Sequence, residues 1–181
     1  MLQRQGLINN SVVLNFSPKD MLCFRGNIPE IDELQTKAMI LRFQKKYAEA
    51  EVVLQEALNK AQKLNEDIAG FNFSATIKVL LADLFCFYSE INFSKAQKFA
   101  EEALESLDNS RSNQRWDTER KYYQTSALLC IAKCMALERK EHLIDWDLLH
   151  KTYSSVRREH IKKKELYSRL AQVSALANKY Q

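Results

Sequence analysis

The sequence predicts an all-α protein built from stacked antiparallel helix hairpins, and three observations support this fold class. The chain of 181 residues contains only three Gly and two Pro, too few for the many turns of a β-sandwich or β-barrel. From Ile31 onward, apolar residues recur with the period of an amphipathic helix. One such pattern occurs twice at a displacement of 46 residues, and a fixed displacement of this size is typical of helical repeat proteins.

Residues 1–30 are expected to form an irregular lead-in that contains one short helix. Four of the five Gly and Pro residues of the chain fall in this stretch. Ser17 followed by Pro18 is typical of a helix start, so we expect a short helix from Pro18 to about Phe24. Pro29 offers a second start, for the first helix of the first pair.

Two helix pairs with matching apolar patterns follow the lead-in. The first pair carries Leu34, Ala38 and Leu41, and on its second helix Tyr47, Ala50, Val53, Leu54, Ala57, Leu58, Ala61 and Leu64. The second pair, 46 residues later, carries Leu80, Leu84 and Phe87 and then Phe93, Ala96, Phe99, Ala100, Ala103, Leu104 and Leu107. Small side chains let paired helices approach closely, so we expect Ala57 and Ala103 to be buried. Because two helices alone cannot bury their apolar faces, neighbouring pairs must stack.

The remaining chain predicts a third, less regular pair and a final helix. The third pair is expected from about Trp116 to Arg139 and over residues 143–156, without the spaced alanines of the first two. A last helix is expected from about His160 to Tyr180, and we interpret it as a cap because the terminal repeats of such arrays are atypical. The expected organisation is a lead-in over 1–30, about three hairpins over 31–159 and a capping helix over 160–181.

The repeated positions resemble the tetratricopeptide repeat (TPR). That family places a small residue in the first helix, an aromatic residue at the turn, and alanines three and ten residues after the aromatic with a bulky apolar residue between them. The positions hold Ala38, Tyr47, Ala50, Leu54 and Ala57 in the first unit and Leu84, Phe93, Ala96, Ala100 and Ala103 in the second. Leu84 and Ala100 depart from the pattern. The displacement also exceeds the family's usual length of about 34 residues, as it does in kinesin light chain and bacterial peptide-receptor repeats.

The TPR resemblance implies an α-solenoid with a right-handed superhelical twist, in which the first helix of each pair lines an inner groove for peptides. The groove would present Gln35, Met39, Arg42 and Phe43 from the first unit, Lys78, Leu81, Phe85 and Tyr88 from the second, and Gln124, Ala127 and Ile131 from the third. The Lys and Asn pairs that grip chaperone carboxylates are not indicated, because Gln35 and Met39 stand at those positions. Alternatively, Met39 and Phe85 pack against adjacent helices.

The resemblance therefore implies a non-catalytic protein–protein interaction module, an adaptor or a subunit of a larger assembly. We expect the partner to be another protein or a peptide held on the concave face. Three units are few for this family, so the chain is expected to dimerise or to complete itself against another protein. A ligand- or peptide-sensing regulatory module is a rival hypothesis, although no DNA-binding or other output unit is evident in the sequence.

Composition and motifs argue against several other classes. The three scattered glycines cannot form a phosphate-binding loop, and no run approaches the ~20 apolar residues of a membrane span. With no visible signal peptide, we expect a cytoplasmic or nuclear protein whose four cysteines are reduced. Cys130 and Cys134 share a helix face but belong to no ligand motif, so we expect buried thiols and neither a metal nor a cofactor. No nucleophile stands in a recognisable catalytic pattern, so we expect no enzyme activity.

The densest basic cluster lies near the C-terminus. It comprises Arg157, Arg158, Lys162, Lys163 and Lys164. This cluster is open to several interpretations: a solvated helix face, a nuclear import signal, or a contact for RNA or acidic lipid. The net charge of +4 for the whole chain is too small to require a nucleic-acid partner. An RNA-binding helical repeat that uses this C-terminal helix remains an alternative to peptide binding.

Overall fold

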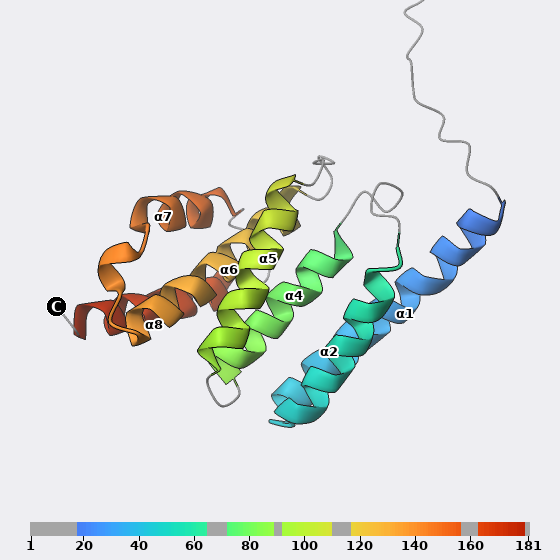
Figure 1. Ribbon diagram of the computed structural model, residues 1–181, viewed down its shortest axis with the longest axis horizontal. Helices are drawn as coiled ribbons and strands as arrows, with labels where there is room; N and C mark the ends of the chain where they lie inside the picture. Colours follow the sequence, from blue (N-terminus) through green and yellow to red (C-terminus); the bar gives the residue numbers. More distant parts are fainter. Residues whose placement is uncertain (1–17, 65–71, 89–91, 110–116, 157–162, 180–181) are drawn as a thin grey trace, which may run out of the picture.

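The computed structural model describes residues 18–64, 72–88, 92–109, 117–156 and 163–179, and this part of the chain is all-α (Figure 1). Seven α-helices are described: α1 Pro18–Phe43, α2 Tyr47–Ala61, α4 Phe73–Asp83, α5 Phe93–Asn109, α6 Asp117–Leu137, α7 Trp146–Ser155 and α8 Lys163–Lys179. A π-helical turn, Leu84–Tyr88, continues α4, and a short 3-10 helix, Glu141–Leu143, precedes α7. Helices that follow one another along the chain pack together, so the predicted fold class is confirmed at this level.

The first helix differs from the sequence prediction. A short helix ending near Phe24 and a second one starting at Pro29 were expected, but α1 runs without interruption from Pro18 to Phe43 with Pro29 inside it. Proline removes one backbone hydrogen bond, and α1 continues past it because its later turns pack against α2. The predicted lead-in before Pro18 lies outside the described residues.

The alanine positions of the repeat are buried as the sequence predicts. Ala50 and Ala57 of α2 are 1% and 0% exposed, and Ala96 and Ala103 of α5 are fully buried. α1 packs on α2 and α4 packs on α5, and small side chains allow such helices to approach closely. Because α2 and α5 begin at Tyr47 and Phe93, the displacement of 46 residues also describes the folded helices.

Side-chain caps explain several helix starts. The Asn72 side chain accepts a hydrogen bond from the Ala75 amide at 2.7 Å at the start of α4. Asn92 accepts one from the Lys95 amide at 3.0 Å before α5. Asp145 caps α7 in the same way. Each cap satisfies an amide that has no partner within the helix, so these polar residues fix where the helices begin.

The same turn ends α1 and α6. Lys45 and Arg139 both have positive φ, 61° and 59°. In each case the backbone amide of the following residue donates a hydrogen bond to the carbonyl five residues earlier. Lys46 donates to Leu41 at 2.9 Å, and Lys140 donates to Met135 at 2.8 Å. This is a Schellman ending in which a non-glycine residue takes the left-handed conformation that glycine usually holds. The turn reverses the chain into the next element at both places.

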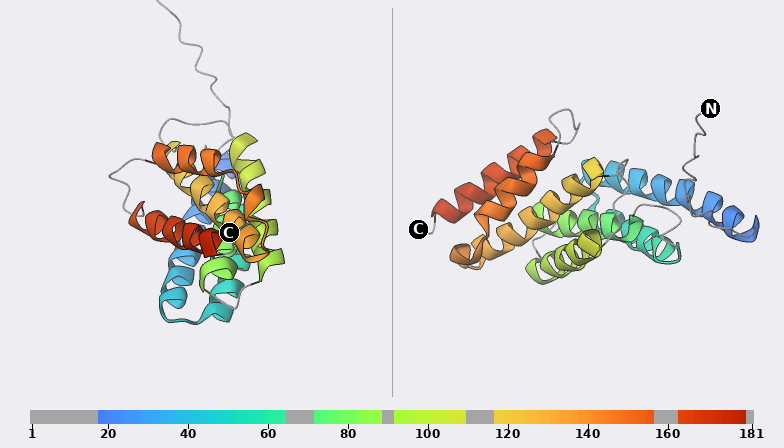
Figure 2. Two further views of the ribbon diagram at one scale, coloured as in Figure 1. Left: turned by 90° about the vertical axis from the view of Figure 1, so that its left-hand side faces the viewer. Right: turned by 90° about the horizontal axis from the view of Figure 1, so that it is seen from above.

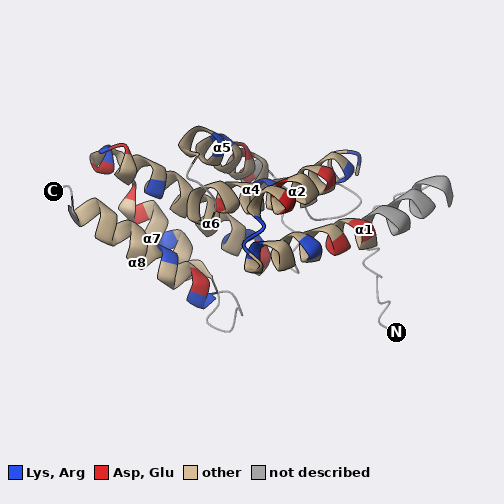
Figure 3. Cartoon of the chain, turned by 90° about the horizontal axis from the view of Figure 1, so that it is seen from below, with Lys and Arg blue, Asp and Glu red and all other residues tan. Residues whose placement is uncertain are grey.

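The last helix, α8, lies against helices from earlier in the chain. α8 packs mainly on α6, and both α8 and α1 lie on one side of the α4–α6 row while α5 lies on the other (Figures 2 and 3). We call the surface of α1, the Leu84–Tyr88 turn and α6 that faces α8 the inner surface. Among the described helices, none combines the length and the apolar content that crossing a membrane would require.

Candidate functional site

A buried ion pair fixes α8 to the inner surface. Arg169 of α8 places Nη1 2.7 Å from Oδ1 of Asp83 at the end of α4, and the two side chains are 3% and 1% exposed. Ser126 of α6 donates to both carboxylate oxygens of Asp83, at 2.9 and 3.2 Å, and the Cys130 thiol donates at 3.2 Å. Arg169 also donates to the Ser126 hydroxyl at 2.6 Å. Three helices therefore meet at one carboxylate.

The ion pair keeps Arg169 charged in spite of its burial. Desolvation by burial lowers the pKa of the guanidinium, but the charges of Asp83 and Glu165 outweigh it, so the pKa of Arg169 is raised above its ordinary value. Moving two charges out of water is unfavourable unless they are paired and hydrogen-bonded. Asp83 and the two terminal nitrogens of Arg169 meet that condition, although the buried Nε of Arg169 has no hydrogen-bond partner among the described residues. These contacts define one position for α8 along α4 and α6.

Glu165 connects α8 to the two earlier units. Its Oε1 lies 2.7 Å from Arg169 Nη2 and 3.8 Å from Arg42 Nη2 of α1. The hydroxyl of Tyr88 donates to the same oxygen at 2.7 Å. Burial raises the pKa of Glu165, but the charge of Arg169, the Tyr88 hydrogen bond and the charge of Arg42 together lower it below its ordinary value. The carboxylate is therefore ionised at neutral pH.

Cations and aromatic rings alternate across the inner surface. Lys133 and Arg169 lie 4.3 and 4.8 Å from the ring centroid of Phe87. Arg169 and Arg42 lie 5.8 and 4.3 Å from the ring centroid of Tyr88. Such contacts stabilise by roughly 0.5–2 kcal/mol each, more when desolvated. The Leu84–Tyr88 turn supplies both rings, and π-helical turns often occur at functional sites.

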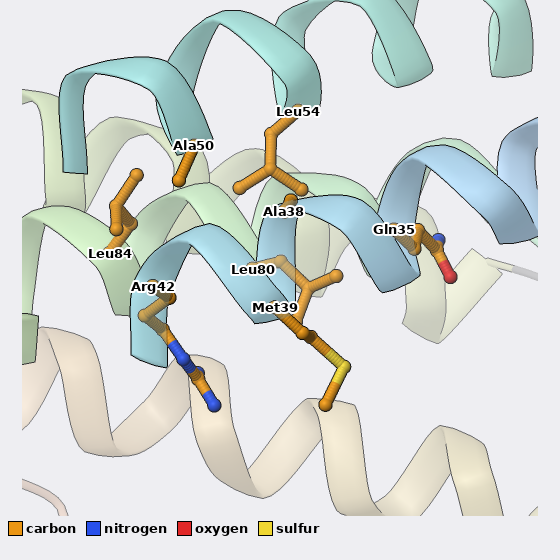
Figure 4. A pocket seen from close by; sticks show the side chains of 8 residues that line it. All are labelled: Gln35, Ala38, Met39, Arg42, Ala50, Leu54, Leu80 and Leu84. Atoms are coloured by element: carbon orange, nitrogen blue, oxygen red, sulfur yellow. The ribbon is translucent and has the colours of Figure 1, made fainter. Parts of the chain in front are cut away.

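The structure brings three predicted groove residues of the first unit to one pocket. Gln35, Met39 and Arg42 of α1 line it, together with Ala38, Ala50, Leu54, Leu80 and Leu84 (Figure 4). The pocket lies between α1, α2 and α4. The lining side chains leave about 10 Å³ between them, close to the room that one water molecule needs. Phe43 follows Arg42 at the end of α1 and is 74% exposed, whereas Ile40 lies in a separate hollow with Asp32 and Thr36 on another face of α1.

The predicted groove residues of the second unit lie elsewhere, apart from Tyr88. Lys78 pairs with Glu102 of α5 at 2.9 Å, Leu81 is fully buried, and Phe85 is 5% exposed and stacks on Phe99 of α5 at 6.2 Å. Leu81 and Phe85 present no open surface in this structure because α4 is a central helix that packs on α2, α5 and α6. For Phe85 the contact with α5 agrees with the alternative that this residue packs against an adjacent helix. Of the predicted groove residues of the second unit, only Tyr88 lies on the inner surface, where it contacts Glu165 and Arg169 of α8.

The third unit contributes little open surface. Gln124 donates to Asp108 of α5 at 2.7 Å, and Ala127 is fully buried. Ile131 is half-buried and packs against the core of the first two pairs. The inner surface of α6 is instead covered by α8, through the contact of Ser126 with Arg169. The part of the predicted groove that remains accessible is therefore the α1 part.

Sequence reasoning missed the residues at the centre of the inner surface. Asp83, Ser126, Glu165 and Arg169 belong to no motif of the repeat. Two signals were present in the sequence: Asp83 is the only acidic residue from Phe73 to Tyr88, and Glu165 and Arg169 stand four apart on the apolar side of α8. A charge inside an apolar helical stretch indicates a buried partner, although it does not say which one.

The predicted basic cluster is only partly described. Arg157, Arg158 and Lys162 lie outside the described residues. Lys163 starts α8, donates to the Val156 carbonyl and has its ammonium 5.1 Å from the Tyr153 ring centroid. Lys164 is exposed. Of the two described lysines, only Lys164 is directed freely to solvent.

Cys86, Cys130 and Cys134 are buried and form no disulfide. Burial raises the pKa of Cys130 to about 11. The pKa of Cys86 is raised first by its hydrogen bond with Cys130, and that of Cys134 by its hydrogen bond with Cys86. These thiols are protonated at neutral pH, whereas a nucleophile or metal ligand acts as the thiolate. Within the described part of the chain no cluster of His, Cys, Asp and Glu is arranged to hold a metal ion.

No protein-family model, curated protein or solved structure matches the chain. The structure shows helices that pack in sequential pairs, whereas the TPR hypothesis rests on the sequence pattern alone.

Proposed function

We propose that the chain is a TPR-like, non-catalytic protein–protein interaction module that holds a partner peptide or helix at the accessible part of its inner surface. The observation that supports this proposal is the depression lined by Gln35, Met39 and Arg42, together with the exposed Phe43, whose ring centroid lies 5.5 Å from the Arg42 guanidinium. Apolar side chains and an arginine around a small depression are the composition of interface anchor sites. An apolar surface of the partner would cover the depression and Phe43.

The dimensions of the pocket favour a macromolecular partner over a small ligand. Small-molecule sites usually have volumes of about 300–1,000 Å³ and enclose most of their ligand. Here the lining side chains leave about 10 Å³ between them, so the pocket is a shallow depression that a partner surface can cover and not a cavity that encloses a ligand. The small volume favours an adaptor or assembly subunit over a module that senses a small ligand.

The test is a comparison of two exposed apolar residues. The full chain is used to capture partners, and each recovered protein is titrated against the parent, Phe43→Ala and the control Val52→Ala, since Val52 of α2 is 67% exposed. We expect Phe43→Ala to weaken binding by roughly 1–3 kcal/mol, about 5- to 150-fold. We expect Val52→Ala to bind as the parent does. Equal affinity of all three chains for every recovered protein would overturn the proposal.

A further inference from the structure

We infer that the place where the C-terminal end of α1 meets the N-terminal end of α8 recognises an acidic, partly apolar segment of a partner protein. This inference rests on the proposed function and narrows the partner class. We call this surface the α1–α8 junction (Figure 3). It consists of Arg42, Phe43, Lys45, Lys46 and Lys164, while Lys163 is turned toward Tyr153 and the Val156 carbonyl.

The contact between Arg42 and Glu165 brings the two helix ends together. Arg42 Nη2 lies 3.8 Å from Glu165 Oε1. Lys45 and Lys46 follow Arg42 in the Schellman turn, and Lys164 precedes Glu165 in the first turn of α8. Residues far apart in the sequence therefore contribute to one surface.

The α1–α8 junction has an excess of positive charge. Its four cations, Arg42, Lys45, Lys46 and Lys164, face two carboxylates, Glu165 and Glu49, so two positive charges remain. Glu165 is engaged by Arg169 and Tyr88, and Glu49 lies 3.6 Å from Lys46. Among the described residues neither Lys45 nor Lys164 forms an ion pair, and both are exposed. Because the whole chain has a net charge of +4, this small surface stands out electrostatically and complements an acidic partner.

An exposed aromatic residue accompanies the charges. Phe43 is 74% exposed, and the Arg42 guanidinium lies 5.5 Å from its ring centroid. Large aromatic side chains beside arginine are the usual anchors of protein interfaces. A partner with Leu- or Phe-type side chains between its carboxylates could bury the Phe43 ring and neutralise the lysines.

The charges along α1 favour a short acidic peptide over a nucleic acid. A single strand of RNA needs a basic track that follows its phosphates over several nucleotides. Along α1, away from the α1–α8 junction, the exposed side chains include Glu30, Asp32 and Glu33. These carboxylates would repel a polyanion that continued along the helix, whereas a short acidic peptide can end before them.

The probe is a short fluorescent peptide of Glu and Leu, with Leu at helical spacing, titrated against the full chain by fluorescence anisotropy. Its comparator has Lys in place of every Glu, and an oligouridylate tests the nucleic-acid alternative. The binding variants are Phe43→Ala and the pair Lys45→Glu with Lys164→Glu. The controls are Val52→Ala and Lys98→Glu, since Lys98 is an exposed lysine of α5. Thermal melts verify that every variant is folded.

We expect the Glu–Leu peptide to bind more tightly than the Lys–Leu peptide, with an affinity that falls as salt is added. The double charge reversal should weaken binding at least tenfold and flatten the salt dependence. Phe43→Ala should also weaken it, while Lys98→Glu and Val52→Ala should match the parent. Equal binding of both peptides, or an equal effect of Lys98→Glu, would overturn the inference. Tighter binding of the oligouridylate with the same dependence on Lys45 and Lys164 would overturn it in favour of a phosphate site.

Failure of this inference can be separated from failure of the proposed function. If a recovered partner depends on Phe43 but not on Lys45 and Lys164, the interaction module stands and the acidic partner class is wrong. If the Phe43→Ala variant also binds every recovered partner as tightly as the parent does, the proposed function itself fails.

Discussion

The contact between α8 and α4 allows a prediction about the free energy of unfolding. Replacing Arg169 with Met removes the cation that lies 2.7 Å from Asp83 and leaves a carboxylate that is 1% exposed. Its remaining donors are Ser126 and Cys130. The opposite change, Asp83→Leu, leaves the guanidinium with Glu165 as its carboxylate partner. Either substitution leaves a buried charge without its closest counter-ion.

The expected magnitude follows from that burial. Removing one member of a buried ion pair destabilises a protein by about 3–5 kcal/mol. We place Arg169→Met near the lower end because two hydrogen-bond donors to Asp83, Ser126 and Cys130, remain. Domains of this size unfold with about 5–15 kcal/mol, so the loss is a large part of the total. The double variant Asp83→Leu with Arg169→Met leaves no buried charge at this position, and it should be more stable than either single variant.

Urea unfolding followed by circular dichroism measures these differences. The matched control is Glu49→Ala, which breaks the exposed Lys46–Glu49 pair, whose side chains are 52% and 61% exposed. Surface pairs contribute about 0–1 kcal/mol, so this variant should unfold close to the parent. If Arg169→Met is as stable as Glu49→Ala, or if the double variant is the least stable of all, the reasoning about this buried pair is refuted.

Three further predictions concern pH, turn geometry and packing. Because the pKa of Glu165 is lowered from 4.5 in the folded state, its ionised form stabilises the fold above about pH 4.5, and this contribution is lost as the pH falls through the folded pKa. The stability gap between the parent and Glu165→Gln should therefore shrink between neutral and acidic urea titrations; a constant gap would contradict this. Lys45→Gly should raise stability by about 0.5–1 kcal/mol, since glycine adopts positive φ without strain, while Lys45→Ala should not; equal melts of the two variants would count against the turn assignment. Ala57→Phe or Ala103→Phe should destabilise by roughly 1–3 kcal/mol or more through overpacking, and melts equal to the parent would show that the helix register is wrong.

The sequence was sufficient to predict the local features of the fold. The starts of α2 and α5 coincide with Tyr47 and Phe93 because apolar spacing and small residues act over neighbouring helical turns. Burial of Ala57 and Ala103 follows from the same periodicity. The continuous α1 was missed because packing outweighs the loss of one hydrogen bond at Pro29. The π-helical turn at Leu84–Tyr88 has no signal in a pattern that assumes one period.

The inner surface could be predicted only in part. Gln35, Met39 and Arg42 share a pocket as their spacing on α1 indicates. Periodicity identifies which side of a helix is apolar, but it does not identify the partner of a charge inside that side. The contact between Asp83 and Arg169 joins distant parts of the sequence, so it depends on the path of the whole chain and not on local spacing. That path also places α8, expected as a terminal cap, over the second and third units.

The position of α8 has a consequence for the order in which the protein acquires its fold. The helix pairs join neighbours in sequence, and such contacts form early and quickly. Tyr88 and Glu165, by contrast, are 77 residues apart, and Arg169 is further still from Asp83. During synthesis the first two pairs emerge well before the residues that neutralise Asp83 exist. Their final arrangement therefore requires the last part of the chain. The contacts of α8 join the locally folding pairs into one cooperative unit.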